Sequence, residues 1–152
     1  MTRPNFIRPS KVNKISASFN DHKHRTPPSL NPGTDYAAPD DTPVVAPANA
    51  RVIAVKRNTN GATGRYIVLD FGDDWVADIF HLSRVSVNVG DRVKKGERIG
   101  LSGGSGFGSE NGYAPHIHIS VRDNGLMLTG LGNKDFESLV SDEKPKATPA
   151  ES

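Results

Sequence analysis

The stretch YAPHIHISVR, residues 113–122, decides the fold. Its alternation of apolar and polar residues is typical of a β-strand with one buried face, with Ile117 and Ile119 turned toward a core. Residues i and i+2 of a strand lie on the same face about 7 Å apart, so His116 and His118 point to one side. Such a pair forms half of a metal site, or one ligand beside a catalytic base, or simply two polar residues on a solvated face.

Five further runs rich in β-branched and aromatic residues have the length of strands. Turn signals separate them, such as the Asn-Gly pair at 60–61 and the Gly-Asp-Asp segment at 72–74. With 15 Gly and 11 Pro, the composition also suits a turn-rich β protein better than a helix bundle. We therefore predict an all-β fold built on a twisted antiparallel sheet, with one short helix near 134–140. The five runs are 42–46, 51–56, 65–71, 75–80 and 92–101.

The composition excludes several classes of protein. The chain has no Cys, which removes disulfides, thiolate zinc sites and cysteine catalysis. A formal net charge of +2 gives little support for nucleic-acid binding. No stretch is apolar enough for a membrane span, and the first residues lack the apolar segment of a secretion signal. If the substrate lies outside the plasma membrane, we expect another agent to deliver the protein.

The 152 residues suggest one domain with two different ends. Residues 1–14 are basic and precede the first dense apolar stretch, so we interpret them as an arm. Residues 141–152 contain no aromatic residue and no aliphatic one larger than Ala, so we expect a disordered tail. The domain itself is then predicted to span 15–140.

Two more residues stand where chemistry is plausible. Asp35 follows a Pro-Gly turn, and His81 ends the run at 75–80. Asp35 could simply cap its turn, and His81 could be a semi-buried histidine with its bonds satisfied. The Gly-rich segment at 102–109 is too flexible for a strand and is predicted to be a loop around a site.

Three segments in order carry a family resemblance: NPGTDYAAPDDTPVVAPANARVIAV (31–55), FHLSRVSVNVGDRVKKGERIGLSGGSG (80–106) and YAPHIHISVR (113–122). Together they closely resemble the lysostaphin and LytM-type zinc endopeptidases, which cleave peptide bridges of bacterial peptidoglycan. The resemblance covers about residues 15–122. It implies the barrel-sandwich-like β core of that family and one bound zinc ion.

Carried over by position, the resemblance implies that Asp35 and His118 are zinc ligands, and that His81 and His116 flank the reacting water. The family's third ligand is a histidine four residues before the aspartate, where this chain has Asn31. An amide oxygen is a poorer zinc ligand than imidazole, so Asn31 is a weak or lost ligand, and His22 or His24 is a candidate substitute. The expected substrate groove is lined by Gly103, Gly104, Gly106 and Phe107.

The expected function is hydrolysis of peptidoglycan cross-bridges by a phage lysin (endolysin) or a virion-associated wall hydrolase. Its partners would then be peptidoglycan and, in a virion, other phage proteins. The alternative, which rests on Asn31, is a non-catalytic LytM-type module that binds peptidoglycan or a partner. Residues 87–100 also resemble the turns of biotinyl and lipoyl carrier domains, but the modifiable lysine between acidic or methionine neighbours does not occur here.

Overall fold

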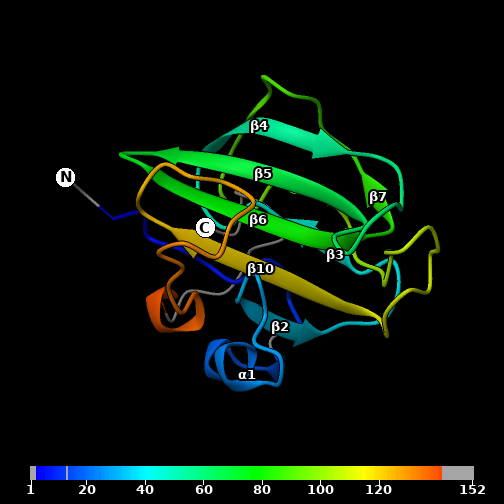
Figure 1. Ribbon diagram of the computed structural model, residues 1–152. Coiled ribbons are helices and arrows are strands. Elements are labelled where there is room, and N and C mark those ends of the chain that lie inside the picture. Colours follow the sequence, from blue (N-terminus) through cyan, green and yellow to red (C-terminus); the bar gives the residue numbers. More distant parts are fainter. Residues whose placement is uncertain (1–2, 13, 142–152) are drawn as a thin grey trace.

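The computed structural model describes residues 3–12 and 14–141, and its strands form two antiparallel sheets (Figure 1). The larger sheet has, in order across it, β1 (Ile15–Ala17), β2 (Thr34–Ala37), β10 (His116–Arg122), β6 (Trp75–Leu82), β5 (Arg65–Gly72), β4 (Ala50–Lys56) and β8 (Arg92–Val93). The smaller sheet has β3 (Pro43–Val45), β9 (Arg98–Leu101) and β7 (Arg84–Val85). The predicted all-β fold of antiparallel strands is confirmed.

The hydrophobic core lies between the two sheets. Ile117 and Ile119 of β10 are fully buried in it, as the alternation along that strand predicts. They share the core with Ile67 of β5, and the smaller sheet contributes Val44 and Ile99. Because the side-chain period of a strand is two, this burial turns the intervening residues of β10 to the opposite face of the large sheet.

That opposite face of the large sheet carries the polar residues. On β10 it presents His118, Ser120 and Arg122, and the strand register sets Phe80 and Asp78 of β6 directly beside the first two. All five side chains are buried or nearly so. A sheet with polar side chains on its second face needs partners for them there, because buried polar groups without hydrogen bonds are costly.

The loop that follows β10 supplies many of these partners. It crosses in front of β5 and β6, where Figure 1 draws it in orange. Asp78 and Arg122 form a fully buried ion pair at 2.7 Å. The Arg122 guanidinium also donates to the carbonyls of Leu126 and Thr129, while the Leu128 amide donates to Asp78. The ion pair therefore fixes the loop over the sheet.

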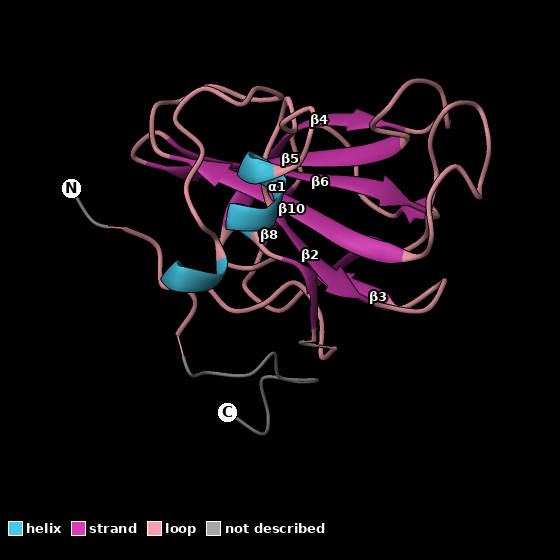
Figure 2. Ribbon diagram, turned by 60° about the horizontal axis from the view of Figure 1, so that its bottom comes forward, coloured by secondary structure: helices cyan, strands magenta, loops and turns pink. Residues whose placement is uncertain are grey.

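The structure corrects the helix predictions. The helix expected at 134–140 is only a 3-10 turn, η1 (Glu137–Leu139), and the single α-helix of the described residues is α1 (Phe19–His24). A capping box starts α1: Ser18 accepts from the Asp21 amide, and Asp21 accepts from the Ser18 amide. Figure 2 shows α1 against the large sheet beside β2 and β10. Among the described residues no helix is long and apolar enough to cross a membrane.

Two other segments differ from expectation. The run at 92–101 is two strands, β8 and β9, separated by a turn in which Gly96 has a φ of +86°. Within the expected N-terminal arm, Phe6 is fully buried and packs edge-on against Phe71, with ring centroids 5.0 Å apart, so this segment contributes to the core. Apart from Ser141, the expected tail at 141–152 lies outside the described residues.

Candidate metal centre

The pairing of β2 with β10 brings an acid and a histidine together. Asp35 and His118 are direct partners in the strand register, although they are 83 positions apart in the sequence. The Asp35 Oδ1 atom lies 2.9 Å from the Nδ1 atom of His118. The resemblance predicted this pair, and the sheet places it on the polar face.

Helix α1 adds a second imidazole. His22 is the buried residue of that helix, and its Nε2 atom lies 3.2 Å from the Oδ2 atom of Asp35. Its ring meets the ring of His118 edge-on, with centroids 5.1 Å apart. One possible ligand atom from each of His22, Asp35 and His118 lies within 4.8 Å of the others. We call these three residues the metal cluster.

The chemistry of the metal cluster fits a zinc ion. Two imidazoles and one carboxylate are three protein ligands of the types that catalytic zinc sites use. The Nδ1 atom of His22 is 2.9 Å from the Ser18 carbonyl, which can only accept a hydrogen bond, so Nδ1 carries a proton and, in the neutral ring, Nε2 has the lone pair and faces Asp35. This is the tautomer that a metal-binding histidine needs.

A tight approach of the backbone accompanies the metal cluster. A Cβ atom on Gly33 would lie 2.8 Å from His118 Nε2 and 2.4 Å from the Ile119 carbonyl oxygen, so only glycine fits there. In the described part of the chain, His118 Nε2 is buried and has no hydrogen-bond partner. An unsatisfied buried atom in a native site is often explained by an ion or a water molecule.

Electrostatics favour the metal-binding form of Asp35 and of His118, but not that of His22. Burial raises the pKa of Asp35, but hydrogen bonds from His118 and His22 outweigh that effect and hold the pKa well below its usual range. Burial lowers the pKa of His118, and its bond with Asp35 offsets this only in part. Burial also lowers the pKa of His22, yet its bond with Asp35 leaves that pKa raised. Asp35 is therefore a carboxylate, the form that binds a metal.

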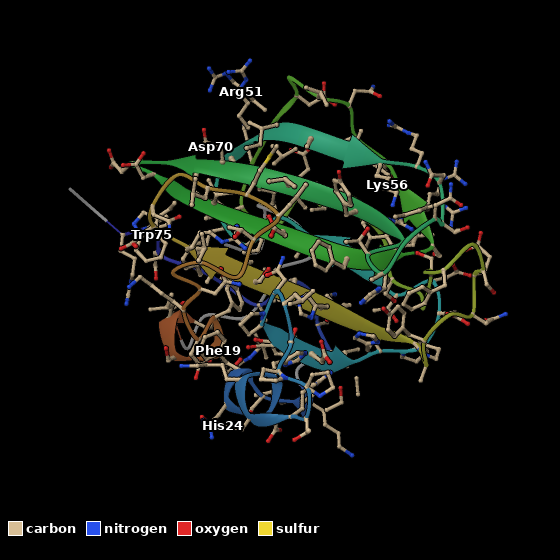
Figure 3. The ribbon with its side chains drawn as sticks, in the orientation of Figure 1. Phe19, His24, Arg51, Lys56, Asp70 and Trp75 are labelled. Carbon is tan, nitrogen blue, oxygen red and sulfur yellow. The ribbon has the colours of Figure 1, made fainter. Side chains whose placement is uncertain are left out.

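Asn31 occupies a different environment. Its Nδ2 atom donates to Asp78 at 3.0 Å, and its Oδ1 atom accepts from Asn133 at 2.7 Å and from Arg122 at 3.4 Å. The side-chain amide is thus bonded to Asn133 and to the buried ion pair on the polar face of the sheet. Of the two substitutes considered, His22 joins the metal cluster, while His24 is exposed on the outer side of α1 (Figure 3).

Two further histidines lie beside the metal cluster, and they are the two that the resemblance implies flank the reacting water. The rings of His81 and His116 are 4.8 Å apart, and His116 Nε2 is 3.6 Å from Asp35 Oδ1. Each ring has its Nδ1 atom on a backbone carbonyl, that of Ser105 for His81 and that of Ala114 for His116. Both Nε2 atoms are therefore hydrogen-bond acceptors.

The environments of these two histidines differ. Burial, together with the neighbouring His118 and His116, lowers the pKa of His81 to about 3, so that His81 stays neutral. His81 also has a φ of +64°, an uncommon backbone conformation for a residue with a side chain. His116 is less buried, and its Nε2 atom faces the Asp35 carboxylate.

The Gly-rich loop lies beside the site, as a loop around a site would, and it also packs against Tyr113. Gly104 and Gly106 let it lie against Tyr113, because a Cβ atom on either would overlap that residue at 2.1 and 2.6 Å. Tyr113 was not singled out from the sequence, yet its ring lies 4.1 Å from that of His81. Phe107 is exposed and packs on Tyr113, with centroids 5.5 Å apart, and Gly103 pairs with His116.

Comparison with known proteins gives a family match. The model of peptidase family M23 matches residues 29–129. The peptidoglycan DD-endopeptidase ShyA of Vibrio cholerae is 35% identical over 111 residues, which cover 71% of this chain and 24% of that protein. The chain spans about a quarter of the length of the first curated relatives that it matches.

Two solved peptidase structures are similar to most of the chain. The catalytic domain of lysostaphin from Staphylococcus simulans is 29% identical with a TM-score of 0.60, and the match covers 70% of this chain and 77% of that one. A zinc-containing peptidase from Vibrio cholerae is 26% identical with a TM-score of 0.66, over 93% of this chain and 41% of that one.

Proposed function

Because the chain belongs to peptidase family M23, we propose that it is a zinc-dependent endopeptidase acting on the peptide cross-links of bacterial peptidoglycan. The observation that carries this proposal is the metal cluster, in which His22 completes a set of three ligands with Asp35 and His118. The similarity to a peptidoglycan endopeptidase supports the choice of substrate.

The residues around the cluster have the chemistry for hydrolysis of a peptide bond. When bound, zinc supplies Lewis-acid chemistry, which polarises the scissile carbonyl and makes a water molecule more acidic. His116 is the general base: its Nε2 lone pair accepts the proton of the attacking water, and the Asp35 carboxylate 3.6 Å away stabilises the resulting charge. The same proton then passes from His116 to the nitrogen of the leaving amine.

His81 has a different role in this scheme. It is neutral and buried, and its Nε2 atom only accepts hydrogen bonds because its Nδ1 proton is bonded to the Ser105 carbonyl. It therefore orients the attacking water without removing its proton. The ring of Tyr113 packs against that of His81, with centroids 4.1 Å apart.

The placement of His22 weakens the alternative of a non-catalytic module. That alternative rested on Asn31, the residue that stands where the family has a histidine. An imidazole from α1 supplies the third nitrogen or oxygen donor, so a histidine at position 31 is not required for a set of three ligands. Delivery by a phage, as a lysin or a virion part, stays a prediction from the sequence.

Digestion of purified peptidoglycan tests the proposed function. The zinc-loaded protein should release new amino groups from purified sacculi, a chelator should stop the release, and added zinc should restore it. His116→Ala is the matched control, because it removes the base and leaves the metal cluster in place. Intact sacculi after treatment with zinc-loaded protein would contradict the proposal.

A further inference from the structure

We propose that the row of side chains Phe80, Tyr66 and Lys56 across the large sheet marks the path of the substrate peptide, which passes over the buried Phe80, and that Lys56 accepts a free carboxylate of that peptide. This inference rests on the proposed function and adds a substrate class to it: peptides that carry a negative charge a few residues from the cleaved bond. We call these three residues the strip.

The strand register aligns the strip with the metal cluster. His118 of β10 stands directly opposite Phe80 of β6, and their rings are stacked at 5.1 Å with planes 3° apart. The ring of Phe80 meets that of Tyr66 on β5 edge-on at 6.2 Å. Tyr66 in turn is the register partner of Lys56 on β4, whose ammonium lies 5.9 Å from the Tyr66 ring. The row therefore runs without a break from a proposed metal ligand to a cation.

The polar groups at the Lys56 end of the strip can form further hydrogen bonds. The Lys56 ammonium donates to the Asn60 carbonyl and, at 3.4 Å, to Thr63 Oγ1, both of which are neutral. Within the described residues it has no carboxylate partner, whereas the nearby cation Arg65 is paired with Glu110. The Tyr66 hydroxyl makes no hydrogen bond in the described part of the chain, and both side chains are partly exposed.

A wall runs along one side of the strip. The turn between β4 and β5, which holds the Lys56 ammonium, is tied to the Gly-rich loop by three bonds. The Tyr113 hydroxyl donates to the Ala62 carbonyl at 2.7 Å, and the Phe107 amide donates to the Gly61 carbonyl, also at 2.7 Å. The Gly108 amide donates to the Thr59 carbonyl at 2.9 Å. The β4–β5 turn and the Gly-rich loop, joined by these bonds, thus border both the proposed catalytic histidines and Lys56.

The length of the strip sets the length of the ligand. Neighbouring strands lie about 4.8 Å apart, so the three steps from β10 to β4 span roughly 14 Å. An extended peptide advances about 3.3–3.6 Å per residue, so a carboxylate at Lys56 is about four residues from a peptide bond at the metal cluster. A cation at this point favours peptides that carry a free carboxylate there, by charge complementarity.

The test compares peptidoglycan fragments, released from sacculi by a muramidase, before and after conversion of their carboxyl groups to amides. We expect amidation to raise KM about fivefold for the wild-type protein with little change in kcat, as for a partly exposed ion pair. Lys56→Met should abolish this difference and Lys56→Arg should keep it. Lys94→Met is the matched control, because Lys94 is an exposed lysine near the start of β4, whereas Lys56 is at its end. Figure 3 labels Arg51 and Lys56, which lie near the start and at the end of that strand.

A binding measurement separates this inference from the proposed function. The zinc-loaded His116→Ala protein is titrated calorimetrically with both kinds of fragment, with and without Lys56→Met. Preference for the free carboxylate that disappears with Lys56→Met supports the strip even if no fragment is hydrolysed. Equal affinity for both fragments, or a preference that persists in the Lys56→Met protein, overturns the inference even if hydrolysis is efficient.

Discussion

His22 Nε2 lies 3.2 Å from Asp35 Oδ2, and this contact joins a six-residue helix to β2, the second strand of the large sheet. The two atoms belong to segments separated by a loop that holds Asn31 in another bonding environment. A histidine from outside the expected motif therefore completes the metal cluster.

Loss of the His22 imidazole should weaken zinc binding. His22→Ala removes one of three ligands and should weaken zinc binding by more than about 100-fold, beyond the loss typical of a partner that only supports a ligand. Competition with a chromophoric chelator measures the affinity. His24→Ala is the control, since His24 is exposed two residues later on the same helix, and it should bind zinc as the wild type does. Equal affinities for all three proteins would refute the role of His22.

Asn31 should behave as a structural residue. Asn31→Ala removes one of several hydrogen-bond partners of Asp78 and of Asn133 and should lower the free energy of unfolding by about 1.5–3 kcal/mol, the range for a hydrogen bond to a charged group. Zinc affinity should change little, and Asn31→His should not increase it while His22 is present. Denaturant unfolding and chelator competition measure the two effects, with the exposed Asn111→Ala as control. A large gain in zinc affinity for Asn31→His would show that position 31 is the ligand position after all.

The two histidines of β10 should separate binding from catalysis. His118→Ala should lose both zinc and activity, because it removes a ligand. His116→Ala should keep zinc and lose turnover, because it removes only the proposed base. Metal analysis beside sacculus digestion gives both readouts. Residual hydrolysis at the wild-type rate in the His116→Ala protein would remove that residue from the mechanism.

The buried ion pair should be important for stability. Asp78→Ala leaves the fully buried Arg122 unpaired and should cost about 3–5 kcal/mol of unfolding free energy. The control is Asp123→Ala, which breaks an exposed pair with Lys134 at 3.8 Å and should cost less than about 1 kcal/mol. Similar losses from both variants in denaturant unfolding would mean that burial of the pair is not what stabilises the loop after β10.

Sequence patterns predicted the features that follow from the two-residue alternation of side chains along a strand. The alternation in 113–122 placed Ile117 and Ile119 in the core and both histidines on the other face, because strand geometry leaves no other arrangement. The resemblance implied that Asp35 and His118 are ligands of one zinc ion, and their register as strand partners came from the structure. Strand order and the approach of α1 depend on contacts between distant segments, and no local pattern carries that information.

The misses have physical reasons as well. Helix α1 is too short to show an apolar period, and only its capping box, Ser18 and Asp21, marks it in the sequence. The apolar spacing at 134–140 suggested a helix, yet Phe136 is buried beside Phe6, and tertiary packing set the local structure there. Tyr113 carried no signal, because its role comes from a loop folded back on His81.

The most direct test of the central claim is a crystal structure of the zinc-loaded protein with the metal located by its anomalous scattering. The account predicts one zinc ion bonded to His22 Nε2, Asp35 and His118, at about 2.0–2.2 Å from each ligand atom. An ion bonded to Asn31 with His22 turned away, or no ion between Asp35 and His118, would contradict it.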